Sequence, residues 1–420
     1  MAREMKDSGI AWIGEIPKEW NISKVGYFFD IQLGKMLQPI RQNASDSLEK
    51  YLCAANVGGN RLRLFSLKEM WFSPAEKKAL KVEKGDMLVV EGGDVASCDI
   101  ITEDIEPIYF QNSIHRVRPL GNYDIRILKY WLWLAKGIGH IDLICNKATI
   151  AHFSKEKFIA LSFIVIPLPD QHRIAAFLDR KCAEIDSVIA DTQKTIEEYK
   201  VLKQSIITEA VTKGVRGERK MKDSGVEWIG KIADGFQLTK LKYLCTILDQ
   251  YRSPIAADQR SQKGEILYDY YGASGVIDKI DGYTIDDHVM LIGEDGANLR
   301  MRNLPLMYEV NGKVWINNHA HILKPTEKTD FYFLFFALEC IDINVYITGS
   351  AQPKLSQDNL KQIWVPTPSY SEQREIAAYI REKCTAIDTL IAAKQQLLTE
   401  LESYKKSVIY EYVTGKKEVL

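Results

Sequence analysis

The sequence has no apolar run long enough to cross a membrane. Its most apolar stretch, Phe331–Ile341, is about half as long as the roughly 20 residues that a bilayer requires, and Asp330 and Asp342 flank it. We therefore expect this stretch to form a buried helix. The opening residues MAREMKDSG are charged and no apolar segment follows them, so the sequence predicts neither a signal peptide nor a transit peptide. We expect a cytoplasmic protein without a membrane partner.

Cysteines are few, and their spacing gives no sign of a metal site. Seven cysteines, an odd number without a CxxC pair, fit neither a disulfide framework nor a zinc knuckle. His319 and His321 are two residues apart and would share one face of a strand, but no third ligand is near them in the sequence. We therefore expect this chain to hold no metal.

An excess of positive charge is also missing. Lysine and arginine number 55 against 56 acidic residues, which gives a net charge of -1. This balance excludes a protein that binds DNA alone and without specificity by neutralising phosphates. A role on nucleic acid would need local basic patches or a basic partner. The composition, 46% hydrophobic and 26% charged, is that of a globular protein, and 420 residues suffice for two or three domains.

The usual catalytic motifs do not occur. Gly34-Lys35 and Gly312-Lys313 lack the serine or threonine that completes a phosphate-binding loop. The sequence contains no HExxH, no GxSxG, no convincing GxGxxG after a strand, and no [DN]PP[YF] tetrapeptide of amino-methyltransferases. Residues 91–94 (EGGD) and 293–296 (GEDG) carry acids of the kind that nucleases use, but without the accompanying lysine; we interpret them as solvated hairpin turns. The sequence favours a binding protein over an enzyme.

An internal repeat with a period of half the chain dominates the sequence. MKDSGIAWIGEI at residues 5–16 recurs as MKDSGVEWIGKI at residues 221–232, identical at nine of twelve positions. Residues 171–214 align without gaps on residues 373–416 and share QxxIAA, KCxxID and SxIxExVT. The period is too long for a solenoid, so the repeat indicates two duplicated halves. Such halves can pack about a pseudo-two-fold axis.

Each half ends in a segment with the periodicity of a long amphipathic helix. Apolar residues step by three and four positions after Pro169 and again after Pro368. We predict two helices that pair with each other as an antiparallel coiled coil, each about 66 Å long for about 44 residues. The predicted seam consists of Leu178, Ile185, Ile189, Ile196 and Tyr199 in the first helix, and Ile380, Ile387, Ile391, Leu398 and Leu401 in the second.

Between opening and helix, each half contains a body that mixes strand and helix signals. Residues 87–90 (MLVV) and 289–293 (VMLIG) are each followed by an acidic turn with glycine and are predicted to be strands. Residues 124–135 and 330–339 each begin with an aspartate that can cap a helix. LVVEGGD corresponds to LIGEDGAN, and IHRVRP to AHILKP, in the second body. The predicted fold class is α+β.

Loop-like segments of both bodies are rich in side chains that suit DNA. Residues 34–42 combine glycine with lysine, glutamine and arginine, and such side chains contact base edges and phosphates. For any one of these residues a solvated loop is the simpler interpretation, but together they favour a reading surface. The candidate DNA-contacting residues are Lys35, Gln38, Arg41, Asn60, Arg61, Arg63, Asp94 and Ser97 in the first body, and Arg252, Ser274, Asn298, Arg300, Arg302, Asn317, Asn318 and His319 in the second.

These motifs together resemble the specificity subunit of type I restriction-modification systems over essentially the whole chain. The openings, IPLPDQHRIAAFLDRKCAEID and its second copy look like that family's conserved regions. YYGASGVID, LIGEDGANL and WINNHAHILKP look like one type of its target-recognition domain, and LGKMLQP and LVVEGGDVA like another. The resemblance implies target-recognition domains at residues 1–168 and 219–368, the former with the opening segment, and conserved helices at residues 169–218, with a linker, and 369–420.

The resemblance also implies a non-catalytic role within a larger complex. Such a subunit reads an asymmetric, bipartite site on double-stranded DNA, with one half-site per target-recognition domain and a spacer set by the paired helices. Its partners are two modification subunits, which methylate adenine, and restriction subunits that translocate and cut DNA. S-adenosylmethionine, ATP and Mg are expected on those partners and no cofactor on this chain. The near-zero charge fits, because partners can supply much of the phosphate contact.

Two other functions stay open on the sequence alone. The first is a self-sufficient methyltransferase or nuclease whose active site escapes motif analysis. Incubating the purified chain with labelled S-adenosylmethionine and DNA would detect it. The second is a coiled-coil scaffold without DNA contact, which would retain no DNA in a sequence-dependent manner even with modification subunits present.

Overall fold

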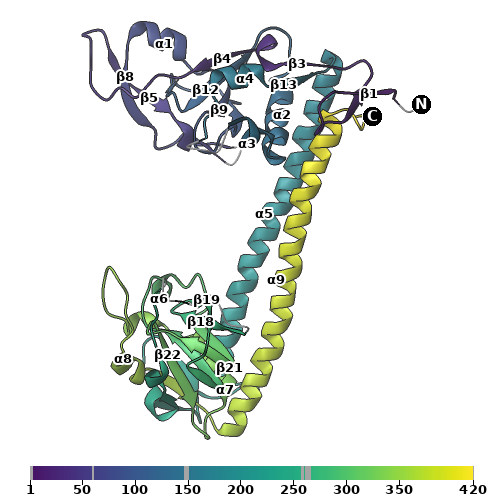
Figure 1. The fold of residues 1–420 in the computed structure, drawn as a ribbon. Helices are drawn as coiled ribbons and strands as arrows, with labels where there is room; N and C mark the ends of the chain where they lie inside the picture. The colour runs from purple at the N-terminus through teal and green to yellow at the C-terminus, as the bar shows by residue number, and fades with distance from the viewer. Residues whose placement is uncertain (1–2, 59–60, 146–150, 257–259, 261–265, 420) are drawn as a thin grey trace. The chain divides into compact units, whose positions relative to one another are not determined.

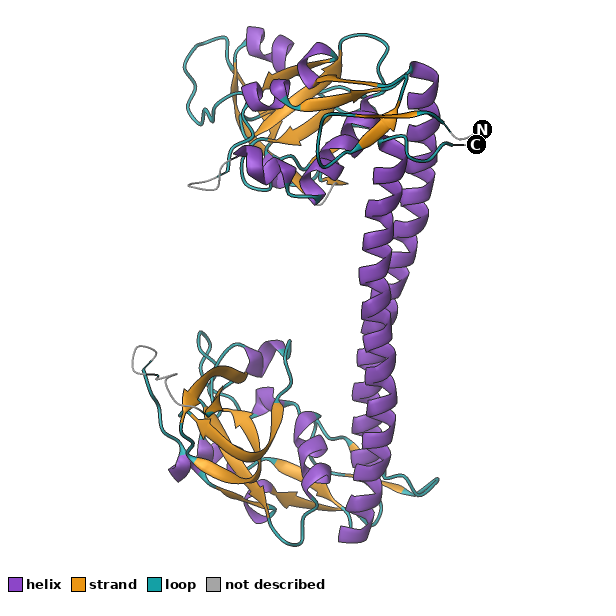
Figure 2. Ribbon diagram, turned by 45° about the vertical axis from the view of Figure 1, so that its right-hand side comes forward, coloured by secondary structure: helices purple, strands orange, loops and turns teal. Residues whose placement is uncertain are grey.

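The chain folds into two compact units. The structure, a computed structural model, describes residues 3–58, 61–145, 151–256, 260 and 266–419, with the backbone alone for Arg61. The first unit consists of residues Met1–Thr192 and Gln396–Leu420, and the second of Gln193–Gln395. Figure 2 shows strands and short helices in each unit and two long helices side by side. The long helices contribute residues to both units.

Short strands, five helices and the end of the long helix α9 (Tyr370–Val413) make up the first unit. The strands are β1 (Met5–Asp7), β2 (Glu15–Pro17), β3 (Asn21–Lys24), β4 (Phe29–Leu33), β5 (Ser47–Leu52), β6 (Val57–Gly58), β7 (Arg61–Leu62), β8 (Lys68–Phe72), β9 (Met87–Val90), β10 (Cys98–Ile100), β11 (Tyr109–Phe110), β12 (Ile114–Pro119) and β13 (Ser162–Val165). The helices are α1 (Pro74–Leu80), α2 (Ile125–Gly137), α3 (His140–Cys145), α4 (Lys155–Ala160) and the first part of α5 (Leu168–Lys213).

A four-stranded antiparallel sheet, β10-β9-β12-β4, is central to the first unit, and the three-stranded sheet β11-β5-β8 lies nearby. All four residues of β9 are buried because both faces of this strand are covered. Met87 and Val89 pack into the core that includes the long helices, whereas Leu88 and Val90 pack into a second core shared with β5 and β8. The uninterrupted MLVV run thus reflects burial on both faces.

The second unit is built from longer strands. Its strands are β14 (Met221–Asp223), β15 (Lys231–Ala233), β16 (Gln237–Lys240), β17 (Cys245–Ile247), β18 (Leu267–Gly272), β19 (Gly275–Asp281), β20 (Ile285–Gly293), β21 (Met307–Ile316), β22 (Ala320–Pro325) and β23 (Trp364–Thr367). Its helices are α6 (Asn298–Met301), α7 (Phe331–Glu339), α8 (Gln357–Lys361), the end of α5 and the first part of α9 (Tyr370–Val413). Short 3-10 turns include η4 (Asp249–Tyr251).

A six-stranded sheet in the order β17-β22-β20-β21-β18-β19 is central to the second unit. Strand β20 matches β9 of the first unit in its burial. Met290 and Ile292 pack into the core with the long helices, and Val289 and Leu291 pack into a separate core on the other face. The predicted strands, the two helices capped by Asp124 and Asp330, and the α+β class are confirmed.

The long helices α5 and α9 pack antiparallel, as predicted, and Figure 1 shows them side by side. In the first unit Lys405 of α9 binds Asp186 of α5 at 2.6 Å, and in the second unit Lys203 of α5 binds Asp388 of α9 at 2.7 Å. The two ion pairs join equivalent repeat positions. Each unit therefore contains the same ion pair between the two helices.

The predicted seam is covered unevenly. Two seam residues are buried in the cores of the units, three more are buried outside those cores, and the rest are half-buried. The buried members are Leu178, Ile185, Ile196, Ile380 and Ile387, and the half-buried members are Ile189, Tyr199, Ile391, Leu398 and Leu401.

The repeated glutamine of the QxxIAA motif joins each body to its long helix. Gln171 accepts a hydrogen bond from the backbone N–H of Asp124 at 2.7 Å and donates to the carbonyl of Ile166. Gln373 accepts from the N–H of Asp330 at 2.8 Å and donates to the carbonyl of Pro368. Both glutamines are almost fully buried. A shared structural contact therefore accounts for this part of the repeat.

Each repeated opening packs against the end of a long helix. In the first unit, the carbonyl of Ile13 accepts hydrogen bonds from the Tyr410 hydroxyl and from Lys416, both at 2.9 Å. Gly415, with φ +71°, lies so close that an added Cβ would be 2.4 Å from Cγ of Pro17 and 2.7 Å from the ring of Trp20. The end of α9 thus closes over the opening segment and requires glycine there.

We expect Gly415→Ala to lower the free energy of unfolding by about 1–3 kcal/mol, because the new methyl group must displace Pro17 and Trp20 and also occupies a left-handed conformation. Urea unfolding of the purified chain measures this. Gly217→Ala is the matched control, since Gly217 has φ +76° but nothing within 4 Å of the added Cβ. Equal losses in the two variants would show that the backbone conformation, not the contact, causes the effect.

Candidate nucleic-acid interface

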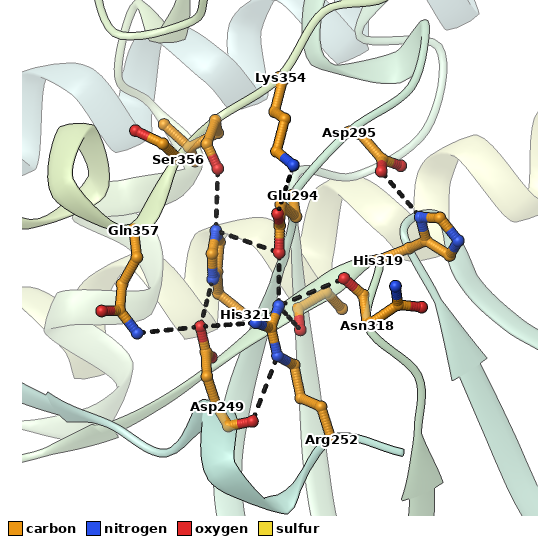
Figure 3. A network of polar contacts seen from close by, with 12 residues as sticks. Asp249, Arg252, Glu294, Asp295, Asn318, His319, His321, Lys354, Ser356 and Gln357 are labelled. Carbon is orange, nitrogen blue, oxygen red and sulfur yellow. Dashed lines mark hydrogen bonds and ion pairs between the residues drawn. The ribbon is translucent and has the colours of Figure 1, made fainter. Parts of the chain in front are cut away.

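A network of charged side chains lies at one end of strand β20 in the second unit (Figure 3). Glu294, directly after β20, binds Arg252 at 2.5 Å and Lys354 at 3.1 Å. Burial alone would raise the pKa of Glu294, but the hydrogen bonds from Arg252 and Lys354 outweigh it and lower the pKa. The side chain of Glu294 is only 13% exposed. The carboxylate therefore organises this end of the sheet and is not the solvated turn predicted from the sequence.

His321 is the buried centre of this network. Its Nδ1 lies 2.7 Å from Oδ2 of Asp249, and its Nε2 lies 2.9 Å from the carbonyl oxygen of Leu355. Both partners are hydrogen-bond acceptors. Burial works against ionisation of Asp249, but the bond from His321 and the positive charges nearby outweigh burial and lower its pKa.

The turn before β22 presents two exposed polar side chains above this network. Asn317 is buried, and its side chain accepts from the N–H of His319 at 2.8 Å, so it shapes the turn. Asn318 is exposed, and only its carbonyl, which accepts from Arg252, has a hydrogen bond among the described contacts. His319 is half-exposed, with Nδ1 2.7 Å from Asp295. The sequence placed His319 and His321 on one strand face; only His321 lies on the strand, and the two bind different aspartates.

The other candidates of the second unit divide into exposed and structural residues. Ser274 is exposed in the turn between β18 and β19, which packs closely against Gly293 at the end of β20. Arg300 is exposed and donates to the carbonyl of Gly349 at 3.0 Å. Asn298 closes its own loop by bonds to the backbone of Leu304, and Arg302 pairs with Glu339 at 3.5 Å.

The first unit repeats the same framework with different residues. Nε2 of buried His115 lies 2.8 Å from the carbonyl oxygen of Phe153, whose N–H donates to the carbonyl of Glu91 at 2.8 Å. In the second unit the N–H of Leu355 donates to the carbonyl of Glu294 at 2.7 Å. Glu91 is paired with His152 at 3.1 Å, as Glu294 is with Lys354.

One partner differs between the two frameworks. In the first unit, Leu33 of β4 lies opposite His115 of β12. In the second unit, Asp249 binds the equivalent His321. As a result, Nδ1 of His115 is buried and has no hydrogen-bond partner among the described residues. Burial lowers the pKa of His115, and the bond to Phe153 offsets this only in part. His115 is thus held as a neutral ring.

The loop after β4 carries three of the candidate residues, and each has an ion-pair or hydrogen-bond partner within the first unit. Lys35 binds Glu76 at 2.6 Å with its side chain 10% exposed. The amide of Gln38 donates to the carbonyl of Ile40 at 3.4 Å, and Arg41 donates to the carbonyl of Asn43 at 3.0 Å. The glycine in this loop allows close packing, because a Cβ on Gly34 would lie 2.4 Å from the carbonyl oxygen of Gln111.

The remaining candidates of the first unit lie on other loops. Asp94 accepts hydrogen bonds from Ser97 and Lys136; burial favours its neutral form, but these bonds outweigh burial and lower its pKa. Arg63 is exposed, and its N–H donates to the carbonyl of Asn56 at 2.9 Å. Asn60 and the side chain of Arg61 lie outside the described residues.

Several residues that organise the site were missed by the sequence analysis. Asp249, Glu294, His321 and Lys354 hold the network together, yet none was among the candidates. The correspondence of IHRVRP with AHILKP and of LVVEGGD with LIGEDGAN was a usable signal, because it aligns His115 with His321 and Glu91 with Glu294. The partners Asp249 and Lys354 come from distant segments and left no such signal.

Two searches were negative for the part of the chain that the structure describes. Within those residues, no group of three or more histidine, cysteine, aspartate or glutamate side chains could hold a metal ion. No helix in the described segments is both long and apolar enough to span a membrane.

Known proteins similar to this chain share one function class. The family described as "Type I restriction modification DNA specificity domain" matches residues 17–198 and 233–403. S.HindORF215P of Haemophilus influenzae is 32% identical over 159 residues, which are 38% of this chain and 37% of that protein. The type I restriction enzyme MjaVIII specificity subunit of Methanocaldococcus jannaschii is 25% identical over 293 residues, 64% of this chain and 65% of that subunit. The matches therefore span less than two thirds of either relative.

A solved structure shares the fold. A chain from a structure of a type I R-M system superposes with a TM-score of 0.72 at 13% identity, covering 95% of this chain and 98% of that chain. The similarity extends over both halves of the repeat and over the long helices.

We expect His115→Gln to flatten the dependence of stability on pH below about 6.5. The pKa of folded His115 is lowered, so the neutral ring stabilises the fold above the unfolded pKa near 6.5, and this contribution is lost as the pH falls toward the folded pKa. Denaturant unfolding at pH 7.5 and pH 5.5 measures it; one proton gives at most about 1.4 kcal/mol per pH unit. The exposed His172→Gln is the control, and an identical loss in wild type and His115→Gln would contradict the prediction.

Proposed function

Because this chain belongs to the family of type I restriction-modification DNA specificity domains, we propose that it selects the DNA sequence on which such a complex acts. The membership confirms the resemblance predicted from the sequence. A specificity domain recognises DNA and leaves the chemistry to other proteins, in line with the prediction of a non-catalytic chain without its own cofactor.

We propose further that each unit reads one half of a bipartite site. The observation that carries this proposal is the duplicated framework. Both units place a buried histidine, a glutamate after the central strand and a backbone bond from Phe153 or Leu355 in equivalent positions. The exposed residues around the two frameworks differ, with Asn318 and His319 near the second and the loop after β4 near the first. Equal frameworks with unequal surfaces support two readers of different sequence, and so an asymmetric site.

The paired helices are proposed to set the spacer between the half-sites. Helix α5 is continuous over 46 residues and α9 over 44, and each contributes to both units. The equivalent ion pairs Asp186–Lys405 and Lys203–Asp388 support a single register and therefore a fixed spacing. Two readers on one face of DNA require half-site centres about one helical turn apart, near 10 to 10.5 bp.

The partners proposed for this chain are double-stranded DNA, two modification subunits and, through them, restriction subunits. With a net charge of -1, the chain has little general attraction for phosphates. The modification subunits would supply S-adenosylmethionine and much of the phosphate contact, and the restriction subunits ATP and Mg. The proposed domain limits are residues 1–168 and 219–368 for the two readers, and 169–218 and 369–420 for the helical segments.

We expect the deletion of seven residues from each helix, 190–196 of α5 and 395–401 of α9, to change the spacer and leave the half-site bases unchanged. Such a deletion removes two helical turns and about 10 Å of helix. Single-molecule sequencing of N6-methyladenine in cells that carry the wild-type or shortened chain, together with its modification subunits, reads both motifs. Altered half-site bases with an unchanged spacer would contradict the proposal that the paired helices set the spacer. A single uninterrupted motif in the wild type would contradict the bipartite site.

We expect Asn318→Ala to relax base discrimination in the second half-site alone, by about 1–3 kcal/mol at one position, because an exposed amide suits an adenine edge. Binding of the assembled complex to duplexes that carry single substitutions in either half-site measures this. Asn311→Ala, an exposed asparagine on β21 outside the network, is the matched control. Equal relaxation in both half-sites would refute the assignment of one half-site to each unit.

A further inference from the structure

In the loop after β4 the apolar side chains are exposed, whereas the basic side chains contact other residues of the first unit. Met36, Leu37 and Ile40 are 75%, 56% and 74% exposed, and Pro39 between them is also exposed. Single exposed apolar residues are common, but three large ones within five positions form a patch that calls for a partner. We call residues 36–40 the apolar tip.

The two basic side chains of this loop already have partners within the first unit. The ammonium group of Lys35 is bound to Glu76 and lies 5.3 Å from the centre of the Phe72 ring. Arg41 donates to the carbonyls of Asn43 and Ala44 and lies over the ring of Trp71 at 5.4 Å. What the loop offers outward is therefore apolar.

The apolar tip is held rigidly from both sides. Before it, the N–H of Lys35 donates to the carbonyl of Phe110 at 3.1 Å, and the carbonyl of Lys35 accepts from the N–H of Asn112 at 2.9 Å. Within it, the carbonyl of Gln38 accepts from the N–H of Trp71 at 3.1 Å. After it, Asp46 accepts from two backbone N–H groups of residues 42 and 43. Such a loop loses little conformational entropy when it inserts into a partner.

The position and charge of the tip favour DNA as that partner. Lys35 is bonded to the turn at residues 110–112, and the next residue, Ser113, accepts from the N–H of Glu91 in the framework proposed to support the first reader. Arg41 bonds only to carbonyl oxygens among the described contacts, so no carboxylate neutralises it, and its charge lies directly beside the tip. A basic residue next to exposed apolar ones suits a duplex, whose phosphates border its stacked bases.

We propose, on the basis of the proposed function, that Met36, Leu37 and Ile40 form a wedge that enters the minor groove at one base step of the first half-site. Methionine, leucine, isoleucine and proline are the side chains with which proteins part base steps and kink DNA. The rigidity of the loop lets it oppose stacking, and Arg41 lies close enough to the tip to attract the adjacent phosphates. The first unit thus recognises the ease with which one step unstacks, as well as base edges.

The test uses the complex reconstituted with its modification subunits and duplexes that carry the methylated motif. 2-Aminopurine placed in turn at each step of the first half-site that does not contain the methylated adenine reports unstacking by fluorescence, and end-labelled duplexes report bending by energy transfer. The variant Met36→Ser/Leu37→Ser/Ile40→Ser changes exposed side chains only, and Leu120→Ser, 60% exposed after the far end of β12, is the control. In the wild type and the control, one step should gain fluorescence severalfold and the duplex should bend. The triple variant should lose both signals and bind roughly tenfold or more weakly.

Other outcomes would overturn the wedge in distinguishable ways. If the wild-type complex binds the motif but no step gains fluorescence, the tip does not part the bases. A triple variant that binds more weakly with unchanged unstacking and bending would indicate contact with thymine methyl groups. Loss of the modification subunits from the triple variant in size-exclusion chromatography would make the tip a protein-docking surface. If the wild-type complex shows no preference for the motif, the proposed function itself fails.

Discussion

The packing of two long helices into the cores of the units is the constraint on which the rest of this structure depends. Several helix residues join the cores of the units, while Ile185, Ile196 and Ile387 are buried outside those cores. Leu178 and Val413 share one core with Trp20 and with Met87 of β9, and Ile380 and Val211 share another with Met290 of β20. Burial of such side chains contributes about 1.5–3 kcal/mol each, so the bodies and the helices stabilise each other. A change in the register of α5 against α9 would disturb both cores.

This coupling explains where the repeat is strict and where it is loose. The openings, Gln171 and Gln373, and the ion-paired positions of the helices make the same contacts in each unit, so they repeat closely. Strands β9 and β20 keep their double-sided burial while their loops differ. The frameworks differ where the first unit has Leu33 and the second has Asp249. Leu33 leaves buried His115 neutral, whereas Asp249 provides His321 with a carboxylate partner.

Most of the helices and strands could be predicted because residues close together in the sequence determine them. Helical periodicity gave α5 and α9, the aspartate caps gave α2 and α7, and apolar runs before acidic turns gave β9 and β20. Side-chain partners could not be predicted in this way, because Arg302 pairs with Glu339 and His321 binds Asp249, and both partners are distant in the sequence. The candidate lysines and arginines looked available in the sequence, but Lys35, Arg252 and Arg302 are engaged within their own units.

Because these basic side chains are paired within their own units, the proposed function separates affinity for DNA from selectivity for its sequence. Buried or paired charges, such as Arg252 between Asp249 and Glu294, cannot leave their partners without a large desolvation cost, so they stiffen the loops. The exposed residues left for reading are few, and together with a net charge of -1 they supply little of the electrostatic attraction that non-specific binding requires. The proposed function therefore requires another protein to hold the duplex against this chain. In that proposal, the rigid loops convert base sequence into differences in fit.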